Sequence, residues 1–118
     1  MGSYKRYREY SRYLTALEHN INILEEKKLR VEKEYKKSQN AGRIMMKIIV
    51  SNTRNLKELD PGSTPRDTIA KKKAKIQNLK TILREIVTRK MPKLKQSYLD
   101  LKWKLQDTEA QLQTVIHL

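Results

Sequence analysis

The chain has 118 residues, and its 27 lysines and arginines outnumber its 13 aspartates and glutamates, which gives a formal net charge of +14. It contains no cysteine, which excludes a disulfide scaffold, a cysteine-based zinc site and thiol catalysis. The length allows one domain, which we predict over residues 1–118, and the positive charge predicts a polyanionic partner.

The hydropathy pattern contains no segment that predicts a membrane span. The longest unbroken apolar runs have three residues, as in Ile44–Met46, whereas a membrane-spanning helix needs about twenty. The N-terminal stretch is charged and rich in tyrosine, which is not typical of a secretory signal. We therefore expect an intracellular protein, in the nucleus or in the cytoplasm.

Turn-forming residues gather between Asp60 and Pro65, and almost none lie elsewhere. They divide the chain into two nearly equal arms. We expect Thr64 to cap the second arm and Pro65 to occupy its first helical position, with Asp67 placed at the positive end of the helix dipole. The first arm, the loop and the second arm are predicted over residues 4–59, 60–64 and 65–118.

Apolar residues in the first arm recur in alternating steps of four and three, which predicts a helix packed along a seam. Eleven of the fifteen seam positions are apolar. Tyr10 is expected to pack against C-terminal residues around Val115, with its hydroxyl in water. The polar positions Lys28 and Asn52 either fix the register or mark a loose part of the seam. The fifteen positions are Tyr10, Leu14, Leu17, Ile21, Leu24, Lys28, Val31, Tyr35, Ser38, Gly42, Met45, Ile49, Asn52, Leu56 and Leu59.

The second arm has the same periodicity, interrupted once. Between Leu83 and Leu94 the interval is eleven residues, which we interpret as a stutter of seven plus four. Pro92 lies inside that interval, so we expect the second helix to kink or to break there. The seam positions are Ile69, Lys72, Ile76, Leu79 and Leu83, followed by Leu94, Tyr98, Leu101, Leu105, Thr108, Leu112 and Val115.

Two helical arms of similar length joined by a short loop predict an all-α antiparallel helical hairpin that resembles a coiled coil. The apolar surface is wider than one seam, and a hairpin alone would leave apolar patches exposed. We therefore expect dimerisation or a helical protein partner to complete a bundle. The residues expected to bind that partner are Ile44, Met45, Ile48, Ile49, Leu83, Ile86, Val87, Leu101, Trp103 and Leu105.

No residue pattern in the chain predicts catalysis. His19 and His117 are isolated in the sequence, and no other ligands accompany them at the spacing of a zinc site. The three glycines are at least twenty residues apart, so no phosphate-binding loop is present. We expect a non-enzymatic protein with no catalytic residue, metal, cofactor or small-molecule substrate.

The basic residues near the loop are the main functional signal, because charge of one sign is typical of a surface that binds phosphates or another acidic polymer. We predict a complex subunit that contacts nucleic acid, chromatin or the acidic surface of a microtubule. The alternatives are a structural spacer without polymer binding and, less favoured, peripheral binding to anionic membranes. The candidate residues are Arg43, Lys47, Arg54, Lys57, Arg66, Lys71, Lys72, Lys73, Lys75, Lys80 and Arg84.

Overall fold

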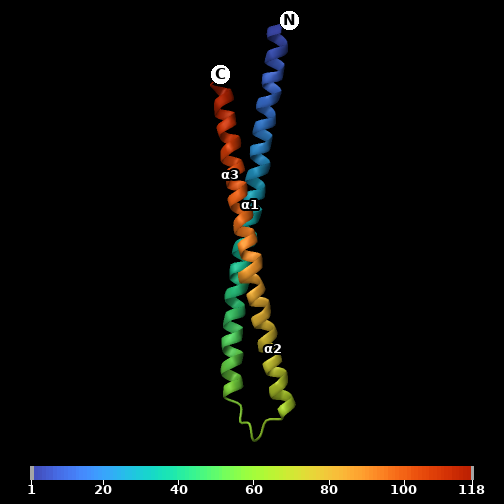
Figure 1. Ribbon diagram of the computed structural model, residues 1–118, viewed down its shortest axis with the longest axis vertical. Coiled ribbons are helices and arrows are strands. Elements are labelled where there is room, and N and C mark those ends of the chain that lie inside the picture. The colour runs from blue at the N-terminus through green and yellow to red at the C-terminus, as the bar shows by residue number, and fades with distance from the viewer. Residues whose placement is uncertain (1, 118) are drawn as a thin grey trace. The chain divides into compact units, whose positions relative to one another are not determined.

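The computed structural model describes the backbone of residues 2–117 and the side chains of residues 5–117. Residues 1 and 118 of the predicted domain lie outside the described residues. Within them the structure contains helices and no strand, which confirms the all-α prediction. The elements are α1 (Gly2–Lys57), α2 (Arg66–Glu85), the π-helical segment η1 (Ile86–Lys90) and α3 (Met91–Ile116) (Figure 1).

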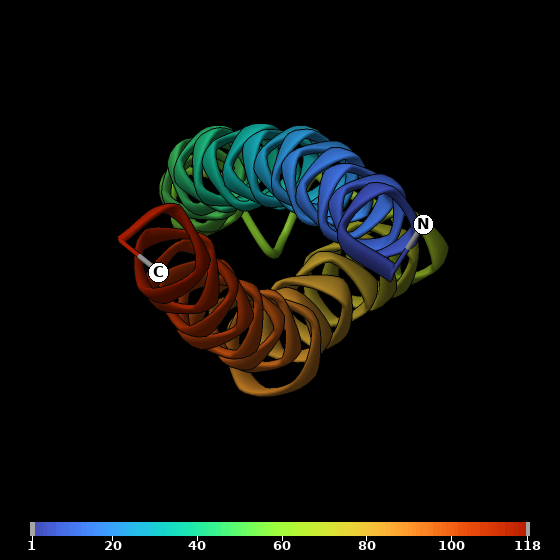
Figure 2. The same cartoon turned by 90° about the horizontal axis from the view of Figure 1, so that it is seen from above.

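The chain forms two compact units, and each pairs part of α1 with a returning helix. Unit 1 comprises Met1–Lys33 and Lys95–Leu118, and unit 2 comprises Glu34–Leu94. Within each unit the two segments run in opposite directions (Figure 1). Figure 2 shows the same helices from above, and among the described residues each unit consists of one α1 segment and one returning helical segment. The predicted antiparallel helical hairpin is confirmed, and each unit buries only the contact between two helices.

The contact between the helices follows the predicted seam. Of the fifteen positions in the first arm, only Tyr10 is exposed, at 37%. Lys28 is half-buried, and its Nζ lies 5.7 Å from the centre of the Tyr98 ring. This cation–π contact lets a lysine occupy a seam position while it keeps its charge. The buried apolar residues are Leu17, Ile49, Ile76, Leu105 and Val115.

Lys72 departs from the predicted seam, because its side chain is exposed. It lines a groove together with Asn52 and Asn55 of α1 and Lys75 and Ile76 of α2. Moving an unpaired ammonium group from water into the seam would cost several kcal/mol, because the charge would lose its hydration. The long, flexible side chain avoids that cost by extending into water.

Pro92 is accommodated by a π-helical segment and not by a break. Proline has no N–H, and its ring clashes with the carbonyl four residues earlier, which here belongs to Thr88. In η1 each hydrogen bond spans one residue more than in an α-helix, as where the N–H of Met91 donates to the carbonyl of Ile86. Helical structure therefore continues from α2 into α3, and the predicted alternative of a broken second helix is wrong.

The extra residue in η1 also explains the irregular heptad spacing. From Leu83, half-buried residues follow at steps of three, five and three, through Ile86 and Met91 to Leu94. The predicted interval of seven plus four is thus resolved by one five-residue step across the π-helical segment. Val87, which we expected to help fill the interval, is exposed.

The start of α2 differs from the prediction. The N-cap is Pro65, and no side chain caps the helix, so the assignment of Thr64 as the cap is wrong. Asp60 organises the loop instead, because its Oδ1 accepts a hydrogen bond from the N–H of Gly62 at 3.0 Å and its Oδ2 accepts one from Ser63 Oγ at 3.2 Å. This Asx-type turn holds the loop that returns the chain toward α1 in unit 2.

In unit 1 the hydroxyl of Tyr10 joins α1 to the end of α3. It donates a hydrogen bond to the carbonyl of Val115 over an O···O distance of 3.0 Å. Because α3 ends at Ile116, this carbonyl belongs to the last turn, where the helix ends before it can supply the usual donor four residues later. The hydroxyl is therefore bonded to the protein, contrary to our expectation that it lies in water.

We predict that Tyr10→Phe destabilises unit 1 by about 0.5–1.5 kcal/mol, the usual net contribution of one hydrogen bond. The loss should also speed amide hydrogen exchange in the last turn of α3, because the end of that helix loses its tie to α1. Exchange followed by mass spectrometry and chemical unfolding followed by circular dichroism measure both effects. Tyr13→Phe is the control, because Tyr13 is half exposed and has no hydrogen bond in the described structure.

The seam of unit 2 contains two small residues of α1, Ser38 and Gly42, which are both buried. The Ser38 hydroxyl has no hydrogen-bond partner in the described structure. A Cβ added to Gly42 would lie 3.6 Å from Cδ1 of Leu83, which is an ordinary van der Waals distance. The helix contact therefore leaves room for a methyl group at this glycine.

We predict that Gly42→Ala stabilises the protein by about 0.5–1 kcal/mol, because alanine restricts the unfolded chain and favours helix more than glycine does. Chemical unfolding of the two proteins measures the difference. Gly42→Leu is the contrasting variant, since its longer side chain would collide with Leu83 and destabilise the seam. A destabilising Gly42→Ala change would show that the helices need the bare backbone here.

Candidate functional site

Positive charge is concentrated in unit 2. Unit 2 holds 16 lysines and arginines and 5 aspartates and glutamates, whereas unit 1 holds 11 and 8. All sixteen cationic side chains of unit 2 are exposed. They include every residue that we predicted to bind an anionic polymer: Arg43, Lys47, Arg54, Lys57, Arg66, Lys71, Lys72, Lys73, Lys75, Lys80 and Arg84.

On α1 the basic residues follow one line along the helix, which we call the α1 basic line. It consists of residues spaced by seven, four, seven and three positions, which return to nearly the same side of a helix. The buried Ile49 lies two residues after Lys47, and two residues correspond to about 200° of rotation. The line therefore faces away from the seam over about 30 Å. Its members are Lys36, Arg43, Lys47, Arg54 and Lys57.

On α2 the basic residues divide between the two sides of the seam. Lys73 and Lys75 flank the line of the buried Ile76, because they lie two residues, or about 200°, apart around the helix. The eleven predicted residues therefore do not form one continuous surface. Arg66, Lys73, Lys80 and Arg84 lie on one flank of α2, and Lys71 and Lys75 lie on the other.

Three of the five carboxylates of unit 2 are engaged locally. Asp67 pairs with Lys71 at 3.6 Å and Glu85 with Arg89 at 3.4 Å, and in both pairs the side chains are largely exposed. Asp60 accepts its hydrogen bonds inside the loop. Because exposed ion pairs are worth only about 0–1 kcal/mol, these contacts leave most of the positive charge available to a partner.

The ten residues expected to bind a partner helix fall into two groups. Six of them are buried or half-buried and lie on the seam of the hairpin itself: Met45, Ile49, Leu83, Ile86, Leu101 and Leu105. The other four are exposed and remain free for a partner: Ile44, Ile48, Val87 and Trp103.

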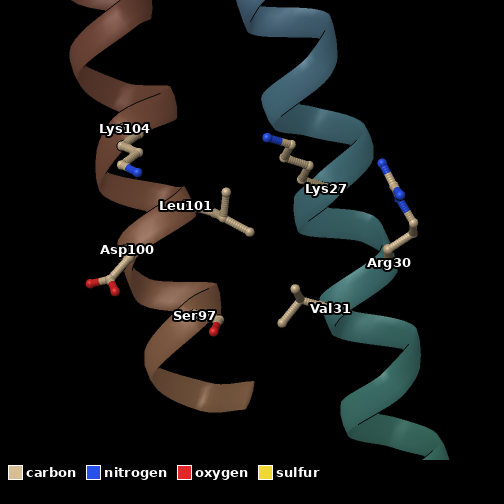
Figure 3. Close-up of a pocket in the computed structure, with 7 residues that line it drawn as sticks. All are labelled: Lys27, Arg30, Val31, Ser97, Asp100, Leu101 and Lys104. Atoms are coloured by element: carbon tan, nitrogen blue, oxygen red, sulfur yellow. The ribbon is translucent and has the colours of Figure 1, made fainter. Parts of the chain in front are cut away.

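Unit 1 contains an open groove of about 430 Å³ between α1 and α3 (Figure 3). Val31 and Leu101 project into the space between the helices, and the ammonium groups of Lys27 and Lys104 point into it from opposite sides (Figure 3). Asp100 points away from α1. The walls of this groove thus combine apolar, cationic and anionic groups.

The aspartates beside this groove are bonded within α3. Asp100 accepts a hydrogen bond from Gln96 Nε2 and Asp107 accepts one from Gln111 Nε2, each at 3.0 Å. Asp100 lies four residues before Lys104 and Asp107 three residues after it, so both are its neighbours on the helix. Their negative charges weaken the attraction of Lys104 for an anion. This groove is therefore a weaker candidate for a polyanion than the exposed cations of unit 2.

Neither histidine belongs to the basic residues of unit 2 or to the residues that line the groove of unit 1. His19 is exposed on α1 and lines a shallow depression with Arg12 and Thr15, and His117 is exposed just beyond α3. Among the residues whose side chains are described, no three histidines, aspartates or glutamates gather so that they could hold a metal ion.

Comparisons of the chain with protein-family models, with curated proteins and with solved structures found no match. None of the described helices combines the length and the hydropathy that crossing a bilayer requires.

The residues predicted to bind a polyanion or a partner helix do not include two that belong to these surfaces. Lys36 lies seven residues before Arg43 and extends the α1 basic line. Ile82 lies seven residues after Lys75 and is 48% exposed on α2. Both could have been found by extending the heptad lines of exposed residues in the same way as the lines of the seam.

Proposed function

We propose that this chain is a non-enzymatic helical-hairpin subunit of a protein assembly, and that unit 2 contacts an anionic polymer, either nucleic acid or the acidic surface of a microtubule. The observation that supports this proposal is the exposure of all sixteen lysines and arginines of unit 2 beside only five carboxylates. Such a surface attracts a polyanion over a distance of about one Debye length, or ~8–10 Å at physiological salt.

The composition of the surface favours contact with charge over reading of sequence. Eleven of the sixteen cations are lysines, which act as point charges, whereas arginine forms the bidentate hydrogen bonds that distinguish bases. The α1 basic line presents its charges along one face of a continuous helix, which suits a repeating backbone of anions. The proposed contact is thus independent of base sequence and dominated by counterion release.

The exposed apolar side chains support the role in an assembly. Ile44, Ile48 and Val87 in unit 2 and Trp103 in unit 1 lie outside the seam. Grouped apolar side chains on a soluble protein mark interaction surfaces, and tryptophan is enriched among residues that dominate binding energy. A partner that contacts these side chains would bury the apolar surface that two helices alone leave exposed.

We predict that the purified chain binds duplex DNA with an affinity that falls steeply with salt. If six to ten phosphates are contacted, the association constant should drop about 10³–10⁵-fold between roughly 50 and 200 mM salt. Fluorescence anisotropy with two DNA duplexes of unrelated sequence measures this, with microtubule co-sedimentation as a parallel experiment. Binding to neither polymer at low salt would contradict the proposal and leave a structural spacer or peripheral binding to anionic membranes.

Charge reversal on the α1 basic line tests the location of the binding surface. Arg43→Glu, Lys47→Glu and Arg54→Glu together should lower the slope of affinity against salt by about one for each phosphate that is no longer neutralised. The matched control is Lys33→Glu, Lys95→Glu and Lys102→Glu, which changes the net charge equally but in unit 1. An equal reduction of affinity in both variants would show that net charge alone drives binding.

A further inference from the structure

Unit 2 has exposed isoleucines on both of its helices. Ile44 and Ile48 of α1 are 59% and 42% exposed, and Ile82 of α2 is 48% exposed. None of them belongs to the seam, so the hairpin itself does not require their apolar character. Their exposure in water is unfavourable by about 25 cal/mol for each Å² of apolar surface.

The three isoleucines lie on the same face of unit 2. Asn55 of α1 and Lys75 of α2 line one groove, which places them on one side of the hairpin. Ile48 lies seven residues before Asn55, and Ile82 lies seven residues after Lys75. Since seven residues return to nearly the same side of a helix, Ile48 and Ile82 share the side of that groove. Ile44 lies four residues before Ile48 and is therefore its neighbour on the helix surface. We call this the groove face.

Cations surround this apolar patch. Lys37 lies seven residues before Ile44 on the same line of α1, and Lys72 and Lys75 line the groove. Three carboxylates lie on or beside these lines. Glu85 follows Ile82 by three residues and is paired with Arg89 at 3.4 Å, whereas Glu34 lies fourteen residues before Ile48 and Glu58 fourteen residues after Ile44. Close to its apolar centre the groove face has three lysines, Lys37, Lys72 and Lys75, and one carboxylate, Glu85, and the other two carboxylates lie farther along α1.

We propose that the groove face binds an acidic amphipathic helix of a partner protein. This inference rests on the proposed role as an assembly subunit and names the chemistry of the partner. The apolar stripe of such a helix would cover Ile44, Ile48 and Ile82, and its flanking carboxylates would meet Lys37, Lys72 and Lys75. An amphipathic helix laid in a groove between two helices is a recurrent mode of recognition.

Charge complementarity favours an acidic partner over a second copy of the chain. A second copy that presented unit 2 would place its 16 cations against another 16, and like charges in contact are unfavourable. A copy that presented unit 1 would still bring more cations than anions. An acidic helix neutralises the rim and covers the apolar centre at the same time.

The groove face is distinct from the α1 basic line. Lys47 of that line lies one residue before Ile48 and three residues after Ile44, but the line as a whole faces away from the seam, whereas the groove face lies beside it. An acidic helix and a polyanion can therefore occupy unit 2 together, because they use different sides of α1.

The test uses a labelled synthetic peptide of about four heptads, with leucine at positions a and d and glutamate at positions e and g. Repulsion between the glutamates keeps this peptide from pairing with itself. The full-length chain should bind it, and a peptide with lysine in place of glutamate should not bind. Binding is measured by fluorescence anisotropy at physiological salt.

Matched variants locate the contact. Ile44→Gln with Ile48→Gln should weaken peptide binding at least about tenfold, and Ile82→Gln should do the same, because each removes an apolar anchor. The control is Met46→Gln with Val50→Gln, which changes two α1 residues at the same spacing and with 51% and 50% exposure, but on the other flank. The control should change affinity less than about twofold.

The outcomes separate this inference from the proposed function. The isoleucine variants should keep the affinity for DNA, and DNA should not displace the peptide from the unaltered chain. Three results would each overturn the inference while leaving polymer binding intact. They are an equal loss of peptide affinity in the isoleucine variants and the control, binding of the lysine peptide, and displacement of the acidic peptide by DNA. Sedimentation of the chain alone adds a last check: a dimer that Ile44→Gln with Ile48→Gln dissociates would assign the face to a second copy.

Discussion

Two helices in contact can bury only the stripe that each turns toward the other, and the remaining features of this protein depend on that constraint. The buried apolar residues are few and lie along the seam, as Leu17, Ile49, Ile76, Leu105 and Val115 do. All other side chains of the described residues, apart from the small Ser38 and Gly42, are partly or fully in water. Charge therefore accumulates on the flanks at little desolvation cost, and apolar residues beside the seam stay exposed unless another chain covers them.

The helix takes up one additional residue just before Pro92. Each residue added to an α-helix turns the subsequent residues by about 100°, so in an uninterrupted α-helix Leu94 would lie about 80° around the helix from Ile86, eight residues earlier. The five-residue step from Ile86 to Met91 compensates for that rotation. Pro92 and the shifted heptad thus coincide in one local adjustment of the helix.

The division of charge between the units gives each a different chemistry. Unit 1 is close to balance, and its groove between α1 and α3 contains both lysines and aspartates, the latter held by glutamines of their own helix. Unit 2 has about three cations for each carboxylate and presents them on several sides. A polyanion on the α1 basic line and an acidic helix on the groove face would both be recognised by this excess, through separate sides of one helix.

The helices, the loop and nearly all of the seam could be predicted from the sequence, because hydrophobic periodicity is a local property that does not depend on the partner segment. The concentration of cations near the loop could also be predicted, because the positions of lysine and arginine are read directly from the sequence. Packing in three dimensions was needed to establish that Lys72 leaves the seam, that Asp60 and not Thr64 organises the loop, and that Pro92 widens the helix without breaking it. It also established which exposed residues share a face, such as Ile48 and Ile82. Two residues on different helices share a face only if the helices pack with the corresponding sides together. That packing is determined by contacts between segments far apart in the chain.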